Sequence, residues 1–189
     1  MTAAATIVII PLGLLIVLVL WAVGMYNGLI RVRNLVQEAW RQIDVELQRR
    51  HDLIPNLVET VKGYATHEKG TFEEVTRARN MAVAPGSSVA EQAQQENVLT
   101  QALGRLIAVA EAYPDLKANQ NFQQLQQELT NTEDRIAAGR RFYNANVREF
   151  NTKIEVFPGN IMASMFGFKR ADYFEIEDPA ARETPEVKF

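Results

Sequence analysis

The feature that most constrains this chain is an apolar run near its N-terminus. Residues 7–25 (IVIIPLGLLIVLVLWAVGM) contain no ionisable side chain. As an α-helix the run reaches about 28 Å, close to the thickness of the hydrocarbon core of a bilayer. It is apolar on every face, whereas a helix in a small soluble core keeps one polar face, so we predict a transmembrane helix. The residues assigned to this membrane anchor are Ile7, Leu14, Leu18, Trp21 and Tyr26.

A cleaved signal peptide is the main alternative to a permanent anchor. Signal peptides carry a basic segment before the apolar one, but the first six residues (MTAAAT) contain no Lys or Arg. Arg31, Arg33 and Arg41 follow the other end of the run. Because basic residues stay on the cytoplasmic side, the bias predicts a single-pass protein with its N-terminus outside and its body in the cytoplasm.

The 163 residues after Tyr26 have helical periodicity and almost no alternation of period 2. Apolar residues between positions 29 and 65 recur at steps of three and four, except for one seven-residue step that passes Arg50 and His51. The first helix is therefore expected to continue out of the membrane. Pro55 interrupts this pattern, so we expect a kink or a new helix start there, with Asp52 as N-cap.

Three further helices are predicted downstream. Residues 71–83 form a short helix whose first residue and Glu74 have the spacing of a capping box. Ser88 and Glu91 repeat this signal before a helix over residues 89–112. The longest pattern runs from residue 122 to residue 157 with coiled-coil-like spacing and one stutter after Gly139.

The predicted fold class is all-α. The N-terminal transmembrane helix continues into a bundle of long antiparallel helices, three or four in number and coiled-coil-like, because a long helix needs partners to bury its apolar stripe. The predicted domains are residues 1–26 (short tail and transmembrane helix), 27–168 (helical bundle) and 169–189 (irregular acidic tail).

Aromatic and charged residues on the two longest helices are candidates for packing and register. We expect the aromatic residues Trp40, Tyr64, Tyr143 and Phe150 to pack between helices. The charged positions Asp44, Arg49 and Asp52 either form a solvated face or set register by pairing with Arg140, Arg141 or Asn144.

The sequence offers little catalytic chemistry. The chain has no Cys, so thiol catalysis and Cys-ligated metals are excluded, and its net charge of −3 argues against a nucleic-acid partner. His51 and His67 would face opposite sides of a continuous helix, so no metal or cofactor is expected. An enzymatic alternative would place an unrecognised polar site near Asp52, Asn56, His67 and Arg141.

Two stretches carry a family resemblance. Residues 26–68 (YNGLIRVRNLVQEAWRQIDVELQRRHDLIPNLVETVKGYATHE) are similar to the signature region of the LemA family of bacterial membrane proteins, and residues 140–168 (RRFYNANVREFNTKIEVFPGNIMASMFGF) resemble its second signature. The resemblance implies an inner-membrane protein with an N-terminal transmembrane helix, a bundle of antiparallel helices and no recognised catalytic residues. One branch of the family is tied to building the magnetosome membrane, and other members occur alongside membrane metalloproteases and similar envelope proteins.

The function expected from these features is that of a membrane-anchored scaffold or adaptor. Such a protein would self-associate as a homo-oligomer, recruit a membrane metalloprotease or another envelope protein, and contact membrane lipid. The first alternative is a membrane-remodelling or lipid-sensing protein that uses Arg31, Arg33 and Arg41 at an anionic leaflet.

Overall fold

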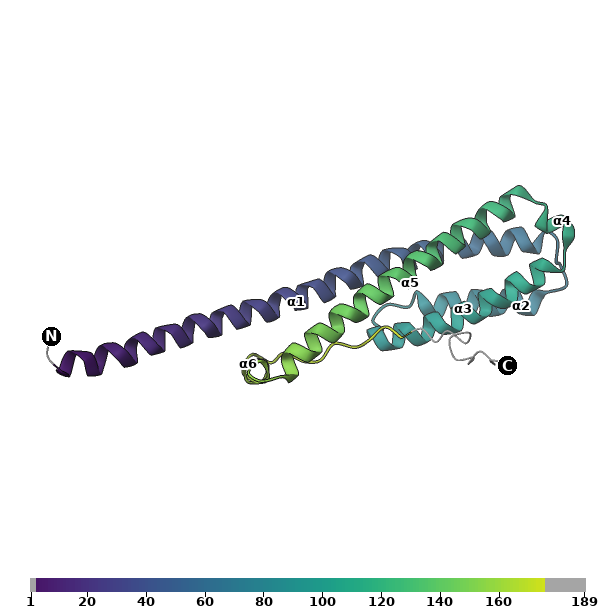
Figure 1. The fold of residues 1–189 in the computed structure, drawn as a ribbon. Helices are drawn as coiled ribbons and strands as arrows, with labels where there is room; N and C mark the ends of the chain where they lie inside the picture. The colour runs from purple at the N-terminus through teal and green to yellow at the C-terminus, as the bar shows by residue number, and fades with distance from the viewer. Residues whose placement is uncertain (1–2, 176–189) are drawn as a thin grey trace, which may run out of the picture. The chain divides into compact units, whose positions relative to one another are not determined.

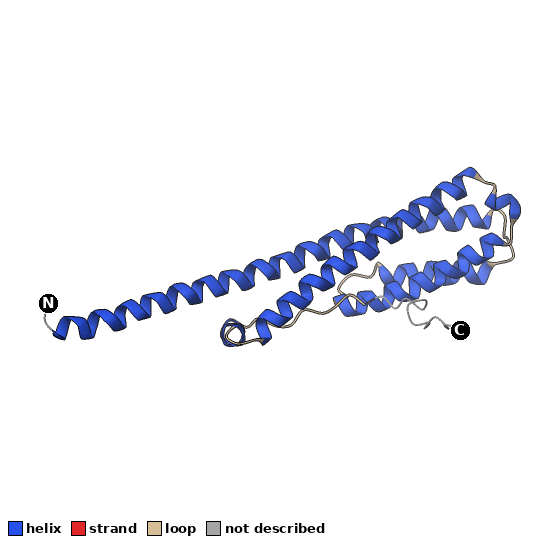
Figure 2. Ribbon diagram, in the orientation of Figure 1, coloured by secondary structure: helices blue, strands red, loops and turns tan. Residues whose placement is uncertain are grey.

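The computed structural model describes residues 3–175, with side chains described from residue 10. Within that range the chain is helical and contains no strand, as Figure 2 shows. The predicted all-α fold is therefore confirmed. The helices are α1 (Ala3–Lys62), α2 (Lys69–Ala82), α3 (Val89–Glu111), α4 (Pro114–Lys117), α5 (Gln120–Glu155) and α6 (Gly159–Phe166), labelled in Figure 1.

The chain divides into two compact units. The terminal unit consists of Met1–Trp40 and Tyr143–Ala171, and the bundle unit consists of Arg41–Phe142 and Asp172–Phe189. Helices α1 and α5 each contribute to both units. The predicted domain boundaries after residues 26 and 168 stay a prediction, and residues 176–189 of the predicted tail lie outside the described part of the chain.

The bundle unit has one apolar core to which α1, α2, α3 and α5 all contribute. The short helix α4 adds one fully buried leucine. The core residues recur at steps of three and four along each helix, so they lie on one face of the helix, and that face points inward. Its larger members are Ile54, Leu57, Val61, Phe72, Val75, Leu99, Leu103, Leu106, Leu116, Phe122 and Leu129.

In the bundle unit, α1 and α5 run antiparallel. Their contacts pair rising residue numbers on α1 with falling numbers on α5: Ile43 with Gly139, Glu46 with Arg135, and Arg50 with Glu133. A Cβ atom on Gly139 would lie 3.0 Å from Cγ1 of Ile43, tighter than an ordinary contact. The glycine therefore allows the two helices to approach closely.

The starts of the two middle helices differ from each other. Helix α3 begins with the predicted capping box, in which the Ser88 hydroxyl accepts from the Glu91 backbone and the Glu91 carboxylate accepts from the Ser88 backbone. The prediction that Thr71 caps the preceding helix was wrong, because α2 already begins at Lys69. The backbone N–H of Thr71 donates to the Glu68 carbonyl at 3.1 Å, so the first turn forms earlier in the chain.

Helix α1 continues through Pro55 without a break, so the predicted kink or restart was wrong. Proline has no N–H group and leaves the carbonyl four residues earlier, that of His51, without its helical partner. The guanidinium of Arg79 on α2 supplies that partner, with Nε donating to the His51 carbonyl at 2.7 Å. Asp52 is not an N-cap but accepts a hydrogen bond from Gln48.

The terminal unit contains the apolar part of α1. Between Ile10 and Val23 its large apolar side chains are exposed. This part of the helix is long and apolar enough to cross a membrane by length and composition. In the same unit, Asn151 of α5 hydrogen-bonds both backbone groups of Ala171 at 2.9 Å, which fastens the segment after α6 to α5.

Candidate functional site

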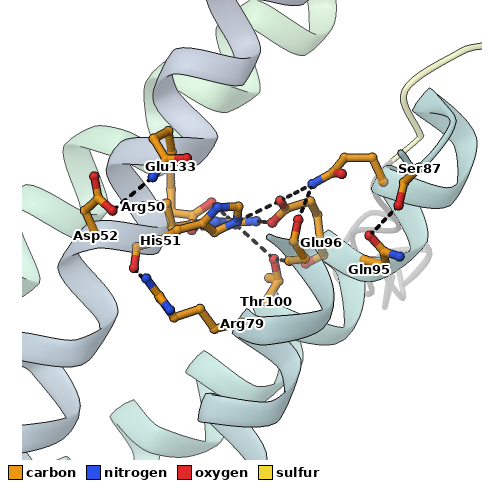
Figure 3. A network of polar contacts seen from close by, with 12 residues as sticks. Arg50, His51, Asp52, Arg79, Ser87, Gln95, Glu96, Thr100 and Glu133 are labelled. Carbon is orange, nitrogen blue, oxygen red and sulfur yellow. Dashed lines mark hydrogen bonds and ion pairs between the residues drawn. The ribbon is translucent and has the colours of Figure 1, made fainter. Parts of the chain in front are cut away.

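Among the described residues, a polar cluster inside the bundle unit joins α1, α2, α3 and α5. Figure 3 shows Arg50 and His51 of α1, Arg79 of α2, Glu96 and Thr100 of α3, and Glu133 of α5. Arg50 and Glu96 are both 0% exposed, and His51 is 4% exposed. We call these residues, together with Gln92 of α3, the buried network.

Glu96 is the centre of the buried network. Its Oε2 atom forms an ion pair with the Arg50 guanidinium. Its Oε1 atom lies 2.9 Å from His51 Nε2 and accepts a second hydrogen bond from Gln92 Nε2, also at 2.9 Å. Both carboxylate oxygens are therefore occupied by donors from within the bundle.

Arg50 extends the network to α5. Its Nη1 atom donates to the two carboxylate oxygens of Glu133 at 2.8 and 3.1 Å and contacts the Thr100 hydroxyl at 3.2 Å. Among the described residues, Arg50 Nε is the buried side-chain nitrogen or oxygen that has no hydrogen-bond partner. Two carboxylates thus surround one buried guanidinium, which favours its charged state.

The pKa values of this pair follow from burial and charge together. Burial raises the pKa of Glu96, but the hydrogen bond from His51 and the positive charge of Arg50 outweigh it, so the pKa lies below its ordinary value of 4.5. For Arg50, burial lowers the pKa, while Glu133 and Glu96 raise it further, and the net direction is upward. Since an ionised Glu96 has no proton to give, His51 Nε2 must donate in their hydrogen bond.

This geometry is suited to holding helices in register. Glu96 is 0% exposed, so a substrate has no access to its carboxylate in the folded bundle. Removing one partner would leave an uncompensated charge in the core, which costs far more than an exposed pair does. The buried network therefore ties α1, α3 and α5 at one level of the bundle.

The predicted packing residues occupy different environments. Trp40 and Tyr143 lie together in the terminal unit, with ring centroids 5.5 Å apart. Phe150 is buried, and its ring centroid lies 6.3 Å from that of Phe168. Tyr64 is 40% exposed, and its hydroxyl accepts a hydrogen bond from Asn119 at 2.9 Å.

The predicted charged register residues are on the surface. Asp44, Arg49, Asp52 and Arg141 are all exposed. Arg49 pairs with Glu46 on its own helix at 3.4 Å. Pairing of Asp44, Arg49 or Asp52 with Arg140, Arg141 or Asn144 stays a prediction. Of the predicted anchor residues, Leu14, Leu18 and Trp21 are exposed, Tyr26 is half-buried, and the side chain of Ile7 lies outside the described ones.

The residues of the enzymatic alternative lie on the surface. Asp52, Asn56, His67 and Arg141 are exposed, and no described contact joins any two of them. Within the described part of the chain, no group of three or more His, Asp and Glu side chains could hold a metal ion.

The sequence contained a signal for the buried network that the search for catalytic and metal-binding motifs missed. Arg50 and His51 fill the seven-residue step between Leu47 and Ile54, where a core residue is otherwise due. Glu96 occupies the equivalent core position on α3, three residues before Leu99. A charged residue at a core position of an amphipathic stripe indicates a buried, paired charge.

Comparison with known proteins identifies the family. The LemA family profile matches residues 39–189. The chain is 31% identical to magnetosome protein MamQ 2 of Paramagnetospirillum magneticum, covering 85% of this chain and 67% of the relative, and 29% identical to MamQ of Magnetospirillum gryphiswaldense over the same shares. It is 30% identical to protein LemA of Metamycoplasma hominis, covering 82% and 71%. The resemblance read from the sequence is confirmed, and the chain belongs to the LemA family.

Proposed function

We propose that this protein is a membrane-anchored helical scaffold or adaptor that acts by contact with other molecules. One observation carries the proposal: the exposed apolar segment and the core stripe of the bundle unit belong to a single uninterrupted helix, α1. Because α1 runs from the exposed apolar segment into the core stripe, an anchor in the membrane keeps the bundle near the bilayer surface, where it recruits partners or a second copy.

The buried network supports a structural role for the bundle. Its fully buried charges, Arg50 and Glu96, neutralise each other between α1 and α3, and the partly exposed Glu133 adds a second carboxylate from α5. Such pairing is expected of a stiff body whose outer faces are used for contact. The names of the matched relatives are not those of enzymes, and we propose no catalytic role. The partner is a second copy, a membrane metalloprotease or another envelope protein.

Membrane remodelling is the second candidate function. It is favoured by the relatives that are named as magnetosome proteins. For either function we propose a single pass through the inner membrane, with the N-terminus outside and the bundle in the cytoplasm, based on the charge bias of Arg31, Arg33 and Arg41.

The absence of native cysteines allows a direct test of anchoring and orientation. Full-length Thr2→Cys and Ser88→Cys variants are labelled in intact cells with a membrane-impermeant maleimide. We expect labelling at residue 2 in intact cells and at residue 88 only after permeabilisation. The reverse pattern overturns the orientation, and release of the full-length protein into the soluble fraction by alkaline carbonate overturns the anchor.

The scaffold proposal has its own test. Full-length protein in mild detergent is measured by light scattering after size exclusion, with the detergent mass subtracted. A particle of two or more copies supports self-association. A strictly monomeric particle that also yields no crosslinked protein partner from membranes contradicts the proposal, whatever the orientation.

A further inference from the structure

The terminal unit carries an apolar patch that the anchor itself does not explain. The patch comprises Val156, Phe157, Ile161, Met165 and Phe166, around the end of α5 and on α6. All five are exposed, Phe157 by 78% and Met165 by 69%. Residues 156–168 (VFPGNIMASMFGF) contain no ionisable side chain. Soluble surfaces rarely gather large apolar side chains in this way, so the patch indicates an interaction site.

The patch lies beside the end of the apolar segment of α1. The Tyr26 ring, one residue beyond the uncharged run, packs against Phe166 with centroids 4.7 Å apart. The same ring lies 5.9 Å from that of Phe168. If the apolar segment crosses a membrane, Tyr26 is at the lipid–water boundary, where tyrosine rings concentrate. The contact then places α6 at the same depth.

The direction of α6 suits that position. In Figure 1, α6 is seen nearly end-on, whereas the neighbouring parts of α1 and α5 run across the view. Helix α6 therefore crosses the direction of α1 and would lie along the surface of a membrane that α1 spans. Gly159 makes this turn feasible, because a Cβ atom there would collide with the carbonyl oxygen of Lys153.

The surrounding charges fit a lipid surface. Lys153 and Glu155 precede the uncharged stretch, and Lys169 and Arg170 follow it. Lys153 pairs with Glu149 at 2.8 Å and Arg170 pairs with Glu155 at 3.0 Å, so Lys169 is the basic residue of this set that is not held in one of these pairs. The Arg33 guanidinium lies over the Phe168 ring, 5.4 Å from its centroid. An apolar segment with basic groups beside it, here Lys169 and Arg33, is typical of helices that lie in the headgroup region of anionic bilayers.

We propose that α6 and the residues just before it insert into the headgroup region of the membrane that α1 crosses, as a second and interfacial membrane contact. The proposal rests on the proposed anchor, because Tyr26 gives the patch its depth. With α1 alone, the terminal unit could rotate about the helix axis. Two separate contacts with the bilayer fix that rotation and so fix which faces of the terminal unit point along the membrane.

The test uses single-cysteine variants of the full-length protein in vesicles of phosphatidylcholine and phosphatidylglycerol. Met165→Cys, Leu18→Cys and Ser88→Cys are each labelled with a pyrene maleimide, whose fluorescence is quenched by nitroxides and which forms excimers when two labels meet. Quenching is then compared between lipids that carry a nitroxide near the headgroup and lipids that carry it deep in the acyl chain. We expect the probe at residue 165 to be quenched most by the shallow nitroxide, at least about twofold more than the probe at residue 88.

The two controls separate the possible failures. A quenched probe at residue 18 with an unquenched probe at residue 165 overturns the interfacial contact and leaves the anchor intact. An unquenched probe at both positions overturns the anchor as well. If the probe at residue 165 is shielded from all lipids and forms excimers as the protein-to-lipid ratio rises, a second copy covers the patch and the lipid contact is wrong.

A charge variant completes the test. Phe157→Glu and Ile161→Glu, added together to the labelled Met165→Cys protein, should abolish shallow quenching at residue 165 while the circular dichroism stays helical. Glu substitutions at the exposed positions Gln94 and Gln101 of α3 serve as matched controls and should leave the quenching unchanged. Quenching that survives the Phe157 and Ile161 substitutions contradicts insertion of α6.

Discussion

The sharpest prediction concerns the carbonyl group that Pro55 leaves free inside α1. Arg79 donates its Nε hydrogen to the His51 carbonyl, and an alanine at position 55 would supply a backbone N–H for the same oxygen. The experiment is a cycle of three variants against the wild type: Arg79→Met, Pro55→Ala and the double variant. Methionine keeps the apolar stem of the arginine and removes only the hydrogen-bonding head.

The size of the effect follows from the burial of the two groups. A hydrogen bond from a charged donor contributes about 1.5–3 kcal/mol, and leaving a buried carbonyl unpaired costs about 1–3 kcal/mol. Arg79 is only half-buried, so water partly replaces it, and we expect Arg79→Met to lower the free energy of unfolding by about 1.5 kcal/mol. In the Pro55→Ala background, the helical N–H takes the carbonyl and the loss should fall below about 0.5 kcal/mol.

The measurement is guanidinium unfolding of the full-length protein in one detergent, followed by circular dichroism at a helical wavelength. Arg105→Met is the matched control, because Arg105 joins α3 to Glu74 of α2 through an exposed ion pair. It should cost well under about 1 kcal/mol in either background. An Arg79→Met penalty that is the same with and without the Pro55→Ala substitution would show that the carbonyl does not link the two residues.

Three further predictions concern the bundle unit. Glu96→Gln should lower the free energy of unfolding by about 3–5 kcal/mol at neutral pH, because it leaves the buried Arg50 charge partly unpaired. Because the pKa of Glu96 is lowered in the folded state, its contribution to the free energy of unfolding is present above the ordinary value of 4.5 and is lost as the pH falls through the folded-state pKa. The stability difference between wild type and Glu96→Gln, measured by denaturation at several pH values, should therefore shrink in acid. Gly139→Val should destabilise the bundle by about 1–3 kcal/mol through collision with Ile43, and a wild-type melting curve would contradict the close approach of α1 and α5. Ser88→Ala should cost about 1 kcal/mol by removing an N-cap, and Ser88→Thr should restore most of it in the same melts.

Most of the helices could be predicted because their apolar periodicity is local. The capping box at Ser88 and the long last helix were both found from residue spacing alone. The start of α2 was missed because backbone hydrogen bonds to the Glu68 carbonyl opened the helix before the predicted cap residue. Several residues near a helix end can start the helix, and a single sequence does not show which of them does.

The continuity of α1 at Pro55 depends on a tertiary contact. Proline disfavours a helix interior because it leaves one carbonyl without its donor and because its ring crowds that carbonyl, and a donor from elsewhere offsets the first of these costs. Here the donor comes from Arg79, which is 28 residues from His51 in sequence. No local pattern reports such a contact, so the sequence alone predicted a break.

The apolar N-terminal segment and the helical stripes could be read from the sequence alone, because each depends on the order of residue types along one helix, and the family could be read from two signature stretches. The same order places Arg50 and Glu96 at core positions, where charge must be paired. The choice of partners, with Arg50 between Glu96 and Glu133, was decided only by the packing of the helices. A buried charge selects its partner by distance in space, and that distance exists only once the helices have packed.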